Sequence, residues 1–529
     1  MATYASRPAW DLRARARAAT SARMAVPAGL GLLVGLSLFL RTRELGIGFW
    51  IDEGLSVGIS DRPLGDIPSA LRRDGSPPLY YTLLHFWIGL FGRGEAQVRG
   101  LSLLCALLMV PAAWWAARAV FGTRVGWIAA VLATLNPFLT QYAQEARMYA
   151  LVALLATPAT ACFLRAYALE APSAAARRPW LAGFAVSVAA ALYTHNWALF
   201  FALACAAAWL LLFVLAPQPR RRQLVRDGLL GFGGAIVLYL PWVPTTLYQA
   251  AHTGAPWSEA PSIGSLAGVP GELLGRIPQI VLLLAAGSGL LALLRARDGR
   301  LTERGRAVAA LIAIAVLTVS LAWLTSQLSP AWANRYLAIG LPPFLLLAAA
   351  GLGAAGRLGL VGLLLVAIMW AQDQAPVEKS NVRAVVEAIG PSLAPGDLVV
   401  STQPETVPVL AYYLPEGLRY ATLTGPLRDV GVWDWRDGVD RLKATSAARD
   451  LRPLVDRLPA GHRIALVEPI TWALNRWQAP WTKLVRLRSE EWRQWLSNDP
   501  RLRVTSIQPT EFTPPRPNPV QATVLVKIR

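Results

Sequence analysis

The chain of 529 residues contains few charged side chains and very little cysteine. Asp, Glu, Lys and Arg together make up 16% of it, whereas hydrophobic residues make up 54%. That balance excludes an ordinary soluble protein of this length. The cysteines, Cys105, Cys162 and Cys205, all lie in apolar runs, which predicts packing roles and argues against a disulfide framework or a cysteine-based zinc site. The sequence also lacks a glycine-rich phosphate loop and an internal repeat.

Long apolar runs dominate what is present. GLGLLVGLSLFL and NWALFFALACAAAWLLLFVLA are typical of membrane helices, which need about 20 apolar residues to cross a bilayer. The sequence therefore predicts a polytopic α-helical membrane protein. The formal net charge of +19 reflects Lys and Arg, which such proteins concentrate in their cytoplasmic loops, so it does not indicate nucleic-acid binding.

The positions of arginine predict the topology. The basic tail 1–23 stays in the cytoplasm, and no signal-peptide cleavage site follows it, so a retained first span at about 24–40 leads to an external loop, 42–96. The apolar run 180–216 has basic residues at both ends, so it forms a hairpin whose tetrapeptide YTHN lies outside. The same reasoning along the chain predicts about eleven spans and an external C-terminus.

The composition changes after the last span. We expect residues 24–372 to form the transmembrane domain, with an interfacial helix in PPLYYTLLHFWIGLFG within the first external loop. Beyond it, short runs such as GDLVVST, HRIALVEP and ATVLVKI alternate with helix-like stretches. This pattern predicts an external α/β domain at 375–529. Its many tryptophans form either a glycan platform or an ordinary core.

Several polar motifs fall on the predicted external side, each near the end of an apolar span: WIDE, RRDGSPPLYY, QYAQEARMY, YTHN, AHTG and ANRY. Ionisable groups at membrane depth are costly, so they usually face a cavity and mark a function. Carboxylates beside arginines suit a reaction on a phosphorylated lipid, in which an acid takes a proton from a hydroxyl and the arginines hold the leaving phosphate. Tyrosine and tryptophan rings offer surfaces for sugar or isoprenoid packing.

Five of these motifs carry a family resemblance: WIDE, DGSPPLYYTLLHFWIGLFG, YAQEARMYAL, YTHN and NRYL. In this order and on one membrane face they resemble the GT-C glycosyltransferases, especially protein O-mannosyltransferases, aminoarabinose transferases and RgtA-like sugar transferases. The resemblance covers about residues 25–345. It implies a multi-pass GT-C protein of a bacterial inner membrane with an extracytoplasmic active site.

The resemblance also implies the reaction and its partners. An inverting transfer would move a sugar, with mannose and arabinose the best-fitting examples, from a polyprenyl-phosphate donor to a hydroxyl of a glycan, a glycolipid or a protein. Asp52 corresponds to the catalytic base, Glu53 to its neighbour, and Asp74 to the second acid of the loop. Three residues are expected at the donor phosphate: Arg147, Arg335 and His195. Substrate contacts are expected from the same motifs: Tyr80, Tyr81, Tyr142, Glu145, Tyr149 and Tyr336.

Simpler roles stay open for these residues. Asp52 would pair with Arg41 or Arg43 if it only capped the loop, and Asp74 would cap the helix that follows Pro77 and Pro78. Many relatives have a histidine two residues after the second acid, where this chain has Ser76. The sequence therefore implies no definite cofactor and leaves a divalent cation open.

Two other functional classes remain as alternatives. A lipid-linked sugar flippase or transporter would place ionisable groups near the bilayer midplane, often in broken helices of repeated halves. A non-catalytic glycan-binding membrane protein would keep the tryptophan-rich domain without needing Asp52. The clustering of acids and arginines on one face favours the transferase.

Overall fold

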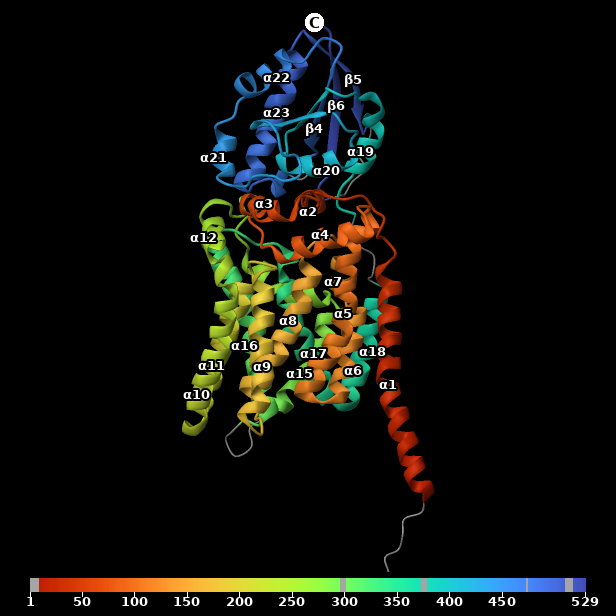
Figure 1. Ribbon diagram of the computed structural model, residues 1–529, viewed down its shortest axis with the longest axis vertical. Coiled ribbons are helices and arrows are strands. Elements are labelled where there is room, and N and C mark those ends of the chain that lie inside the picture. The colour runs from red at the N-terminus through yellow and green to blue at the C-terminus, as the bar shows by residue number, and fades with distance from the viewer. Residues whose placement is uncertain (1–8, 295–300, 373–377, 472–473, 510–516) are drawn as a thin grey trace, which may run out of the picture.

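A computed structural model describes residues 9–294, 301–372, 378–471, 474–509 and 517–529. A bundle of long helices carries an α/β domain at one end, and shorter helices lie across the bundle between the two (Figure 1). The predicted tail 1–23 lies partly outside the described residues. The predicted start of the second domain at 375 lies wholly outside them.

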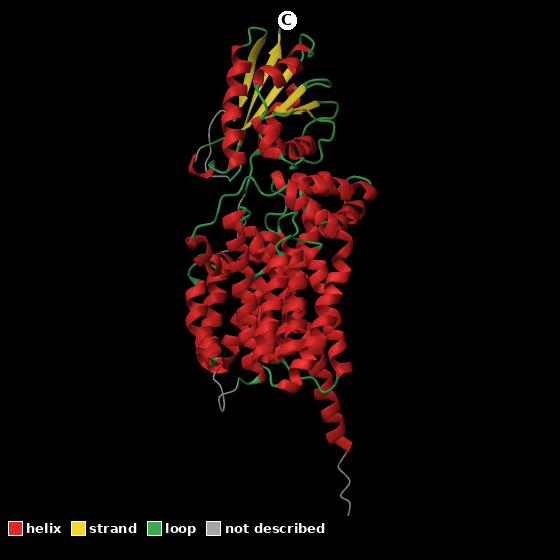
Figure 2. Cartoon of the chain, turned by 90° about the vertical axis from the view of Figure 1, so that its left-hand side faces the viewer, coloured by secondary structure: helices red, strands yellow, loops and turns green. Residues whose placement is uncertain are grey.

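The long helices of the bundle run side by side in both views (Figures 1 and 2). They are α1 (Ala9–Arg41), α5 (Glu95–Phe121), α6 (Thr123–Leu135), α8 (Tyr149–Phe163), α9 (Ala174–Leu192), α10 (Ala198–Leu215), α11 (Gln218–Tyr239), α15 (Pro278–Leu294), α16 (Glu303–Leu328), α17 (Leu341–Ala354) and α18 (Gly356–Gln372). In the described part of the chain, 5 helices are long and apolar enough to cross a membrane, or 6 if a pair bent by 86° counts as one span. The expected multi-pass helical architecture is confirmed, and the count of about eleven spans stays a prediction.

Short elements gather at the end of the bundle that faces the α/β domain. The first loop forms α2 (Ile51–Ser60), α3 (Ile67–Asp74) and α4 (Leu79–Phe91), and later loops add α7 (Pro137–Ala143), α12 (Val243–His252), α13 (Ile263–Ala267), α14 (Val269–Leu274) and the 3₁₀ helix η4 (Asn334–Ile339). The expected interfacial helix corresponds to α4, which leaves Phe86, Leu90 and Phe91 exposed. An apolar face on a helix too short to span suits an interfacial position.

The α/β domain contains a six-stranded sheet in the order β3-β2-β1-β4-β6-β5. Its strands are β1 (Leu398–Ser401), β2 (Arg419–Thr422), β3 (Gly425–Pro426), β4 (Arg463–Pro469), β5 (Leu502–Gln508) and β6 (Val520–Lys527). β1 pairs in parallel with β2 on one side and β4 on the other, whereas β6 is antiparallel to β4 and β5. All four residues of β1 are buried, as expected where helices cover both faces of a parallel sheet.

Helices pack around this sheet: α19 (Val382–Ile389), α20 (Val407–Tyr413), α21 (Gly438–Lys443), α22 (Arg452–Asp456) and α23 (Pro480–Asn498). Trp433, Trp481 and Trp492 are almost fully buried and form one cluster with residues of β1 and β4. Most of the described tryptophans of this domain therefore serve its core. Trp435 belongs to the same cluster and also lines a cavity described below.

The α/β domain sits directly on α2 through two glycines that share one helix face. A Cβ atom added to Gly54 would lie 2.6 Å from the backbone nitrogen of Val409, and one added to Gly58 would lie 2.2 Å from the carbonyl oxygen of Gly431. Neither distance leaves room for a methyl group. The absence of side chains on this face of α2 therefore allows the two backbones to touch.

Ion pairs reinforce the same contact. Asp429 of the α/β domain accepts hydrogen bonds from Arg62 (3.2 Å) and Arg73 (2.7 Å) of the first loop. The backbone N–H of Trp435 donates to the carbonyl oxygen of Arg73 at 2.9 Å. The first loop is thus held between the bundle and the α/β domain.

Candidate active site

A cavity of about 450 Å³ lies where the bundle meets the α/β domain. Its walls come from the first loop, from the segments before α8, around the α9–α10 turn and before α17, and from the α/β domain. Six of the residues singled out in the sequence line it: Asp52, Asp74, Arg147, His195, Arg335 and Tyr336. Folding therefore brings the separate external motifs to one place.

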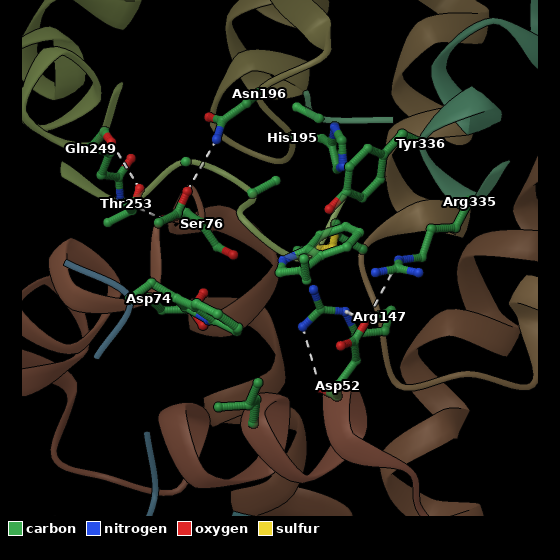
Figure 3. A pocket seen from close by; sticks show the side chains of 18 of the residues that line it. Asp52, Asp74, Ser76, Arg147, His195, Asn196, Gln249, Thr253, Arg335 and Tyr336 are labelled. Carbon is green, nitrogen blue, oxygen red and sulfur yellow. Dashed lines mark hydrogen bonds and ion pairs between the residues drawn. The ribbon is translucent and has the colours of Figure 1, made fainter. Parts of the chain in front are cut away.

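Asp52 occupies the first turn of α2, where the positive end of the helix dipole favours a carboxylate. Its Oδ2 lies 3.5 Å from Nε of Arg335 and 3.9 Å from Nε of Arg147. Figure 3 shows both guanidinium groups directed toward it. These distances are longer than those of hydrogen-bonded ion pairs, and in the described part of the chain the Nε atoms of both arginines are buried without a hydrogen-bond partner. Both guanidinium groups can therefore bind another anion.

The alternative pairing of Asp52 with Arg41 does not occur. Arg41 is fully buried in the bundle, where it donates to Ser37 and to the carbonyl oxygens of Ala106 and Ala133. It serves to hold α1 against its neighbours.

Glu53 points away from the cavity and forms a bidentate pair with Arg99. Arg99 Nε donates to Oε1 at 2.8 Å and Nη2 to Oε2 at 2.7 Å, and each side chain is 1% exposed. The N–H of Ala146 also donates to Oε1, at 2.8 Å. This pair ties the start of α2 to α5 and to the loop that carries Arg147. Arg99 was missed in the sequence, although a cation at the external end of an apolar span is a usable signal.

Tyr80 and Tyr81 support Arg147 from behind the cavity. Arg147 Nη1 donates to the hydroxyl of Tyr81 at 3.1 Å and to Oγ of Ser56 at 3.2 Å. The hydroxyl of Tyr80 contacts Oγ of Ser102 at 2.9 Å, and Ser102 donates to the carbonyl oxygen of Arg147 at 3.0 Å. Both tyrosines are fully buried. Tyr81 orients the guanidinium group, and Tyr80 supports the backbone of Arg147 through Ser102. Neither tyrosine lines the cavity.

Aromatic rings pack around His195. The ring of Tyr336 lies 4.7 Å from it and that of Tyr149 lies 6.0 Å from it, between centroids, and Tyr142 packs on Tyr149 at 5.1 Å. Of these tyrosines, only Tyr336 lines the cavity. Tyr142 and Tyr149 form the layer behind it.

The environment of His195 makes it a neutral hydrogen-bond donor. Burial, with a further contribution from Arg147 and Arg335, lowers its pKa to about 3. Its Nδ1 accepts the backbone N–H of Trp197 at 3.1 Å, which leaves the ring proton on Nε2. His195 can donate one hydrogen bond to an anion in the cavity without adding positive charge.

Asp74 ends α3 and lies across the cavity from the arginines (Figure 3). Burial raises the pKa of its carboxyl group, and a hydrogen bond with Ser76 acts in the opposite direction. The turn that follows is clamped by Asn196, which donates to Gly75 O at 3.1 Å, and by Gln249, which donates to Ser76 O at 3.2 Å. The residue that caps α4 is Pro78, so Asp74 does not play the capping role considered above.

Glu145 does not line the cavity but binds Lys379, the first described basic residue after α18. The Nζ of Lys379 also lies 4.2 Å from the ring centroid of Trp50, which is a cavity residue. Glu145 thus anchors the segment that leads into the α/β domain. Lys379 lies outside the external motifs and was not predicted.

Comparisons with known proteins show which proteins this chain resembles. The family model described as dolichyl-phosphate-mannose-protein mannosyltransferase matches residues 75–248. The crystal structure of ArnT from Cupriavidus metallidurans in the apo state aligns with a TM-score of 0.61 at 14% identity, over 95% of this chain and 98% of that one. The chain therefore has the same fold as ArnT. The fold that the five motifs implied is thereby confirmed.

Two further solved structures agree. ArnT from the same organism bound to undecaprenyl phosphate aligns with a TM-score of 0.59 at 14% identity, over 94% of this chain and 97% of that one. The archaeal oligosaccharyltransferase AglB from Archaeoglobus fulgidus, in complex with an inhibitory peptide and a dolichol-phosphate, aligns with a TM-score of 0.55 at 10% identity, over 83% and 69%. No curated protein matches in sequence. The expected transferase class agrees with the family model and with these folds.

The residues of this site do not fit a divalent cation. Two guanidinium groups flank Asp52, and they repel a metal ion. Throughout the described ranges, no group of three His, Cys, Asp or Glu side chains could hold one. No chemical step is therefore assigned to a metal.

The cavity also has a wall that was not predicted from the sequence. Gln403, Glu405, Trp435 and Asn518 of the α/β domain line it together with the bundle residues. Their position depends on how the domain docks, and no local pattern in the sequence reports that.

Proposed function

We propose that the protein is an inverting glycosyltransferase with a polyprenyl-phosphate sugar as donor. Mannose or arabinose is transferred to a hydroxyl of a glycan, a glycolipid or a protein, on the extracytoplasmic side of a bacterial inner membrane. The observation that carries this proposal is the convergence of one carboxylate, Asp52, and two arginines, Arg147 and Arg335, on a cavity at the end of an apolar bundle. The undecaprenyl phosphate bound to ArnT and the dolichol-phosphate bound to AglB support the donor class.

The geometry divides the chemistry between these residues. Without substrate, Asp52 is the carboxylate that forms ion pairs with both arginines. A donor phosphate replaces it there, because planar guanidinium groups bind phosphate oxygens well. Asp52 then accepts the proton of the acceptor hydroxyl as the acceptor oxygen bonds to the anomeric carbon. The bond from that carbon to the phosphate breaks on the opposite face, and polyprenyl phosphate leaves with Arg147 and Arg335 stabilising its charge.

The place of the cavity separates this proposal from transport. A flippase or transporter is expected to hold its ionisable groups near the bilayer midplane. Here they lie at the end of the bundle, beside the α/β domain (Figure 1). A binding protein without activity has no need of a carboxylate between two arginines.

Asp52→Asn tests the catalytic role directly. The purified protein in liposomes is given undecaprenyl-phosphate mannose or arabinose and candidate acceptors, and product is measured by mass spectrometry. We expect Asp52→Asn to lower kcat by about 10²–10⁴-fold, because an amide cannot take the proton. Donor binding should persist, since both arginines remain.

The matched control is Asp66→Asn, an exposed carboxylate of the same loop. It should leave kcat unchanged. Wild-type turnover in Asp52→Asn contradicts the base assignment, whereas a wild-type protein that turns over no donor contradicts the transferase itself.

A further inference from the structure

The edge of the sheet that faces the cavity is the edge at which open α/β sheets bind ligands. β1 lies between β2 and β4 and is parallel to both. The chain builds the sheet first on the β2 side of β1 and later on the β4 side, so the strand order reverses at β1. In such sheets ligands bind outside the carboxyl ends of the strands, at this switch point. Gln403 and Glu405 follow the carboxyl end of β1 and line the cavity.

Glu405 is a buried carboxylate with neutral partners. Its residue is 6% exposed. Oε1 accepts hydrogen bonds from Nε1 of Trp481 at 3.0 Å and from Nε2 of Gln403 at 3.2 Å. No Lys, Arg or His side chain within the described ranges forms an ion pair with Glu405. Burial raises the pKa of this carboxyl group, and the neighbouring Asp52 carboxylate adds to the effect. Burying a carboxylate is costly unless it is paired and hydrogen-bonded. A ligand that donates further hydrogen bonds would offset this cost.

The surroundings of Glu405 suit one kind of ligand. Trp435, 8% exposed, lines the cavity and packs on Trp481 with 5.0 Å between ring centroids. Trp50 and Trp257 line the cavity as well. Nε1 of Trp50 and Oε1 of Gln249 are buried there without a hydrogen-bond partner in the described part of the chain. Flat apolar faces combined with scattered neutral donors and acceptors match a ring that carries several hydroxyls.

The cationic side chains of the cavity lie on one side of it. Arg147, Arg335 and the donor Nε2 of His195 gather on the bundle side, where an anion fits. The described residues of the α/β domain contribute polar side chains and an aromatic ring, but no cation, to the cavity wall. The bundle side therefore suits a phosphate. The α/β side suits an uncharged group that is attached to the phosphate or lies next to it.

We propose that Gln403, Glu405 and Trp435 form the sugar-binding wall of the site, with the Glu405 carboxylate accepting sugar hydroxyls and Trp435 packing on the ring. This assignment rests on the proposed function. The ring belongs either to the lipid-linked donor or to a glycan acceptor, since both present the same hydroxyls. The α/β domain thus determines which sugar the enzyme uses.

Binding experiments with Glu405→Ala and Glu405→Gln test the assignment on the full-length protein. The probes are undecaprenyl-phosphate mannose, undecaprenyl-phosphate arabinose and undecaprenyl phosphate without a sugar. We expect the wild-type protein to bind one sugar lipid more tightly than the bare lipid. Glu405→Ala should weaken that sugar lipid about tenfold or more, because hydroxyls lose a charged acceptor. Its affinity for the bare lipid should not change, which also shows that the variant is folded.

Glu405→Gln keeps the volume of the side chain and should show a smaller loss in the same direction. The control is Glu416→Ala, an exposed glutamate of the same domain, with no change expected.

A second experiment tests whether the ring belongs to the acceptor. The phosphate site is filled with bare undecaprenyl phosphate, and methyl mannoside or methyl arabinoside is added. Saturation-transfer NMR signals that are lost in Glu405→Ala assign the wall to the acceptor.

The outcomes are separable. A loss in either arm supports the sugar-binding wall and tells which substrate it contacts. Unchanged binding in both arms, with the bare lipid still bound, overturns the wall and leaves the transferase intact. A wild-type protein that binds none of the lipids overturns both.

Discussion

Adjacent carboxylates of the same loop acquire different roles at the scale of single residues. Glu53 is enclosed and makes a bidentate pair with Arg99, whereas Asp52, one residue away, faces the cavity with two long ion pairs. Glu53 and Arg99 together hold α2 in place. Removing either partner of this buried pair leaves an uncompensated charge, so we expect substitution of either residue to be strongly destabilising. Asp52 keeps acceptor capacity for a substrate. We therefore propose catalysis for Asp52 and positioning for Glu53.

His195 yields a prediction about pH at the same scale. Burial and the two arginines lower its pKa to about 3, below the usual 6.5, so we expect it to stay neutral between pH 5 and 8. We expect His195→Gln, which keeps a hydrogen-bond donor, to reduce kcat/KM by about tenfold or less. The shape of the pH–rate profile between pH 5 and 8 should not change.

The measurement is kcat/KM at closely spaced pH values for the wild type, His195→Gln and the control His85→Gln, whose residue lies outside the cavity. A limb near pH 6 that disappears only in His195→Gln contradicts a neutral His195.

At the scale of elements, α2 is the part that aims the proposed base. Its first turn is fastened through Glu53 to α5, and its glycine face, Gly54 and Gly58, lies against the backbone of the α/β domain. The helix cannot rotate without breaking one of these contacts. The direction of Asp52 is thus determined jointly by the bundle and by the α/β domain.

Gly58→Ala tests this arrangement without touching the cavity. Alanine favours a helix by about 1 kcal/mol over glycine, so local helix stability cannot explain a loss. The new Cβ would lie 2.2 Å from the carbonyl oxygen of Gly431, so α2 must shift. A displacement of about 1 Å can cost about 10²-fold in rate, and we expect a fall in kcat of that order.

Steady-state kinetics of Gly58→Ala and of the control Gly65→Ala provide the measurement. A Cβ at Gly65, in the same loop, meets nothing within 4 Å, so its activity should remain normal. Equal activity of the two variants would show that α2 tolerates the shift.

The whole molecule works as two parts that close one cavity. The bundle offers the cations and the proposed base, and the α/β domain covers them and adds its own polar and aromatic wall. Asp429 links the parts through Arg62 and Arg73. Burial alone would raise the pKa of Asp429, but hydrogen bonds and charges from the two arginines outweigh it and lower this pKa below its usual 3.8.

This link predicts how stability depends on pH. A lowered carboxyl pKa contributes stability above the usual value of 3.8, and the contribution is lost as the pH falls below it. We expect Asp429→Asn to unfold at a lower temperature than the wild type at pH 7. The difference should shrink as the pH falls below 3.8 and through the lowered pKa of Asp429. Thermal unfolding of both proteins in detergent from pH 7 into the acid range checks it, and a difference that stays constant as the pH falls contradicts the ionic origin.

Local patterns in the sequence were enough to predict several features. Apolar runs predict membrane helices because crossing a bilayer requires them, and the composition after the last span predicts the sheet domain. The motif resemblance predicts the GT-C fold. The external motifs also predict which acids and arginines meet, and the structure brings Asp52, Arg147 and Arg335 to one cavity.

Only the tertiary structure decided how neighbouring residues divide their roles. Asp52 and Glu53 are indistinguishable in the motif WIDE, and Tyr80 and Tyr81 look like substrate contacts until Arg147 and Ser102 appear behind them. Glu405 and Trp435 enter the site because two glycines let the α/β domain approach α2. Such roles depend on which distant side chains pack together. Helix periodicity and charge distribution are properties of neighbouring residues, so they cannot report that packing.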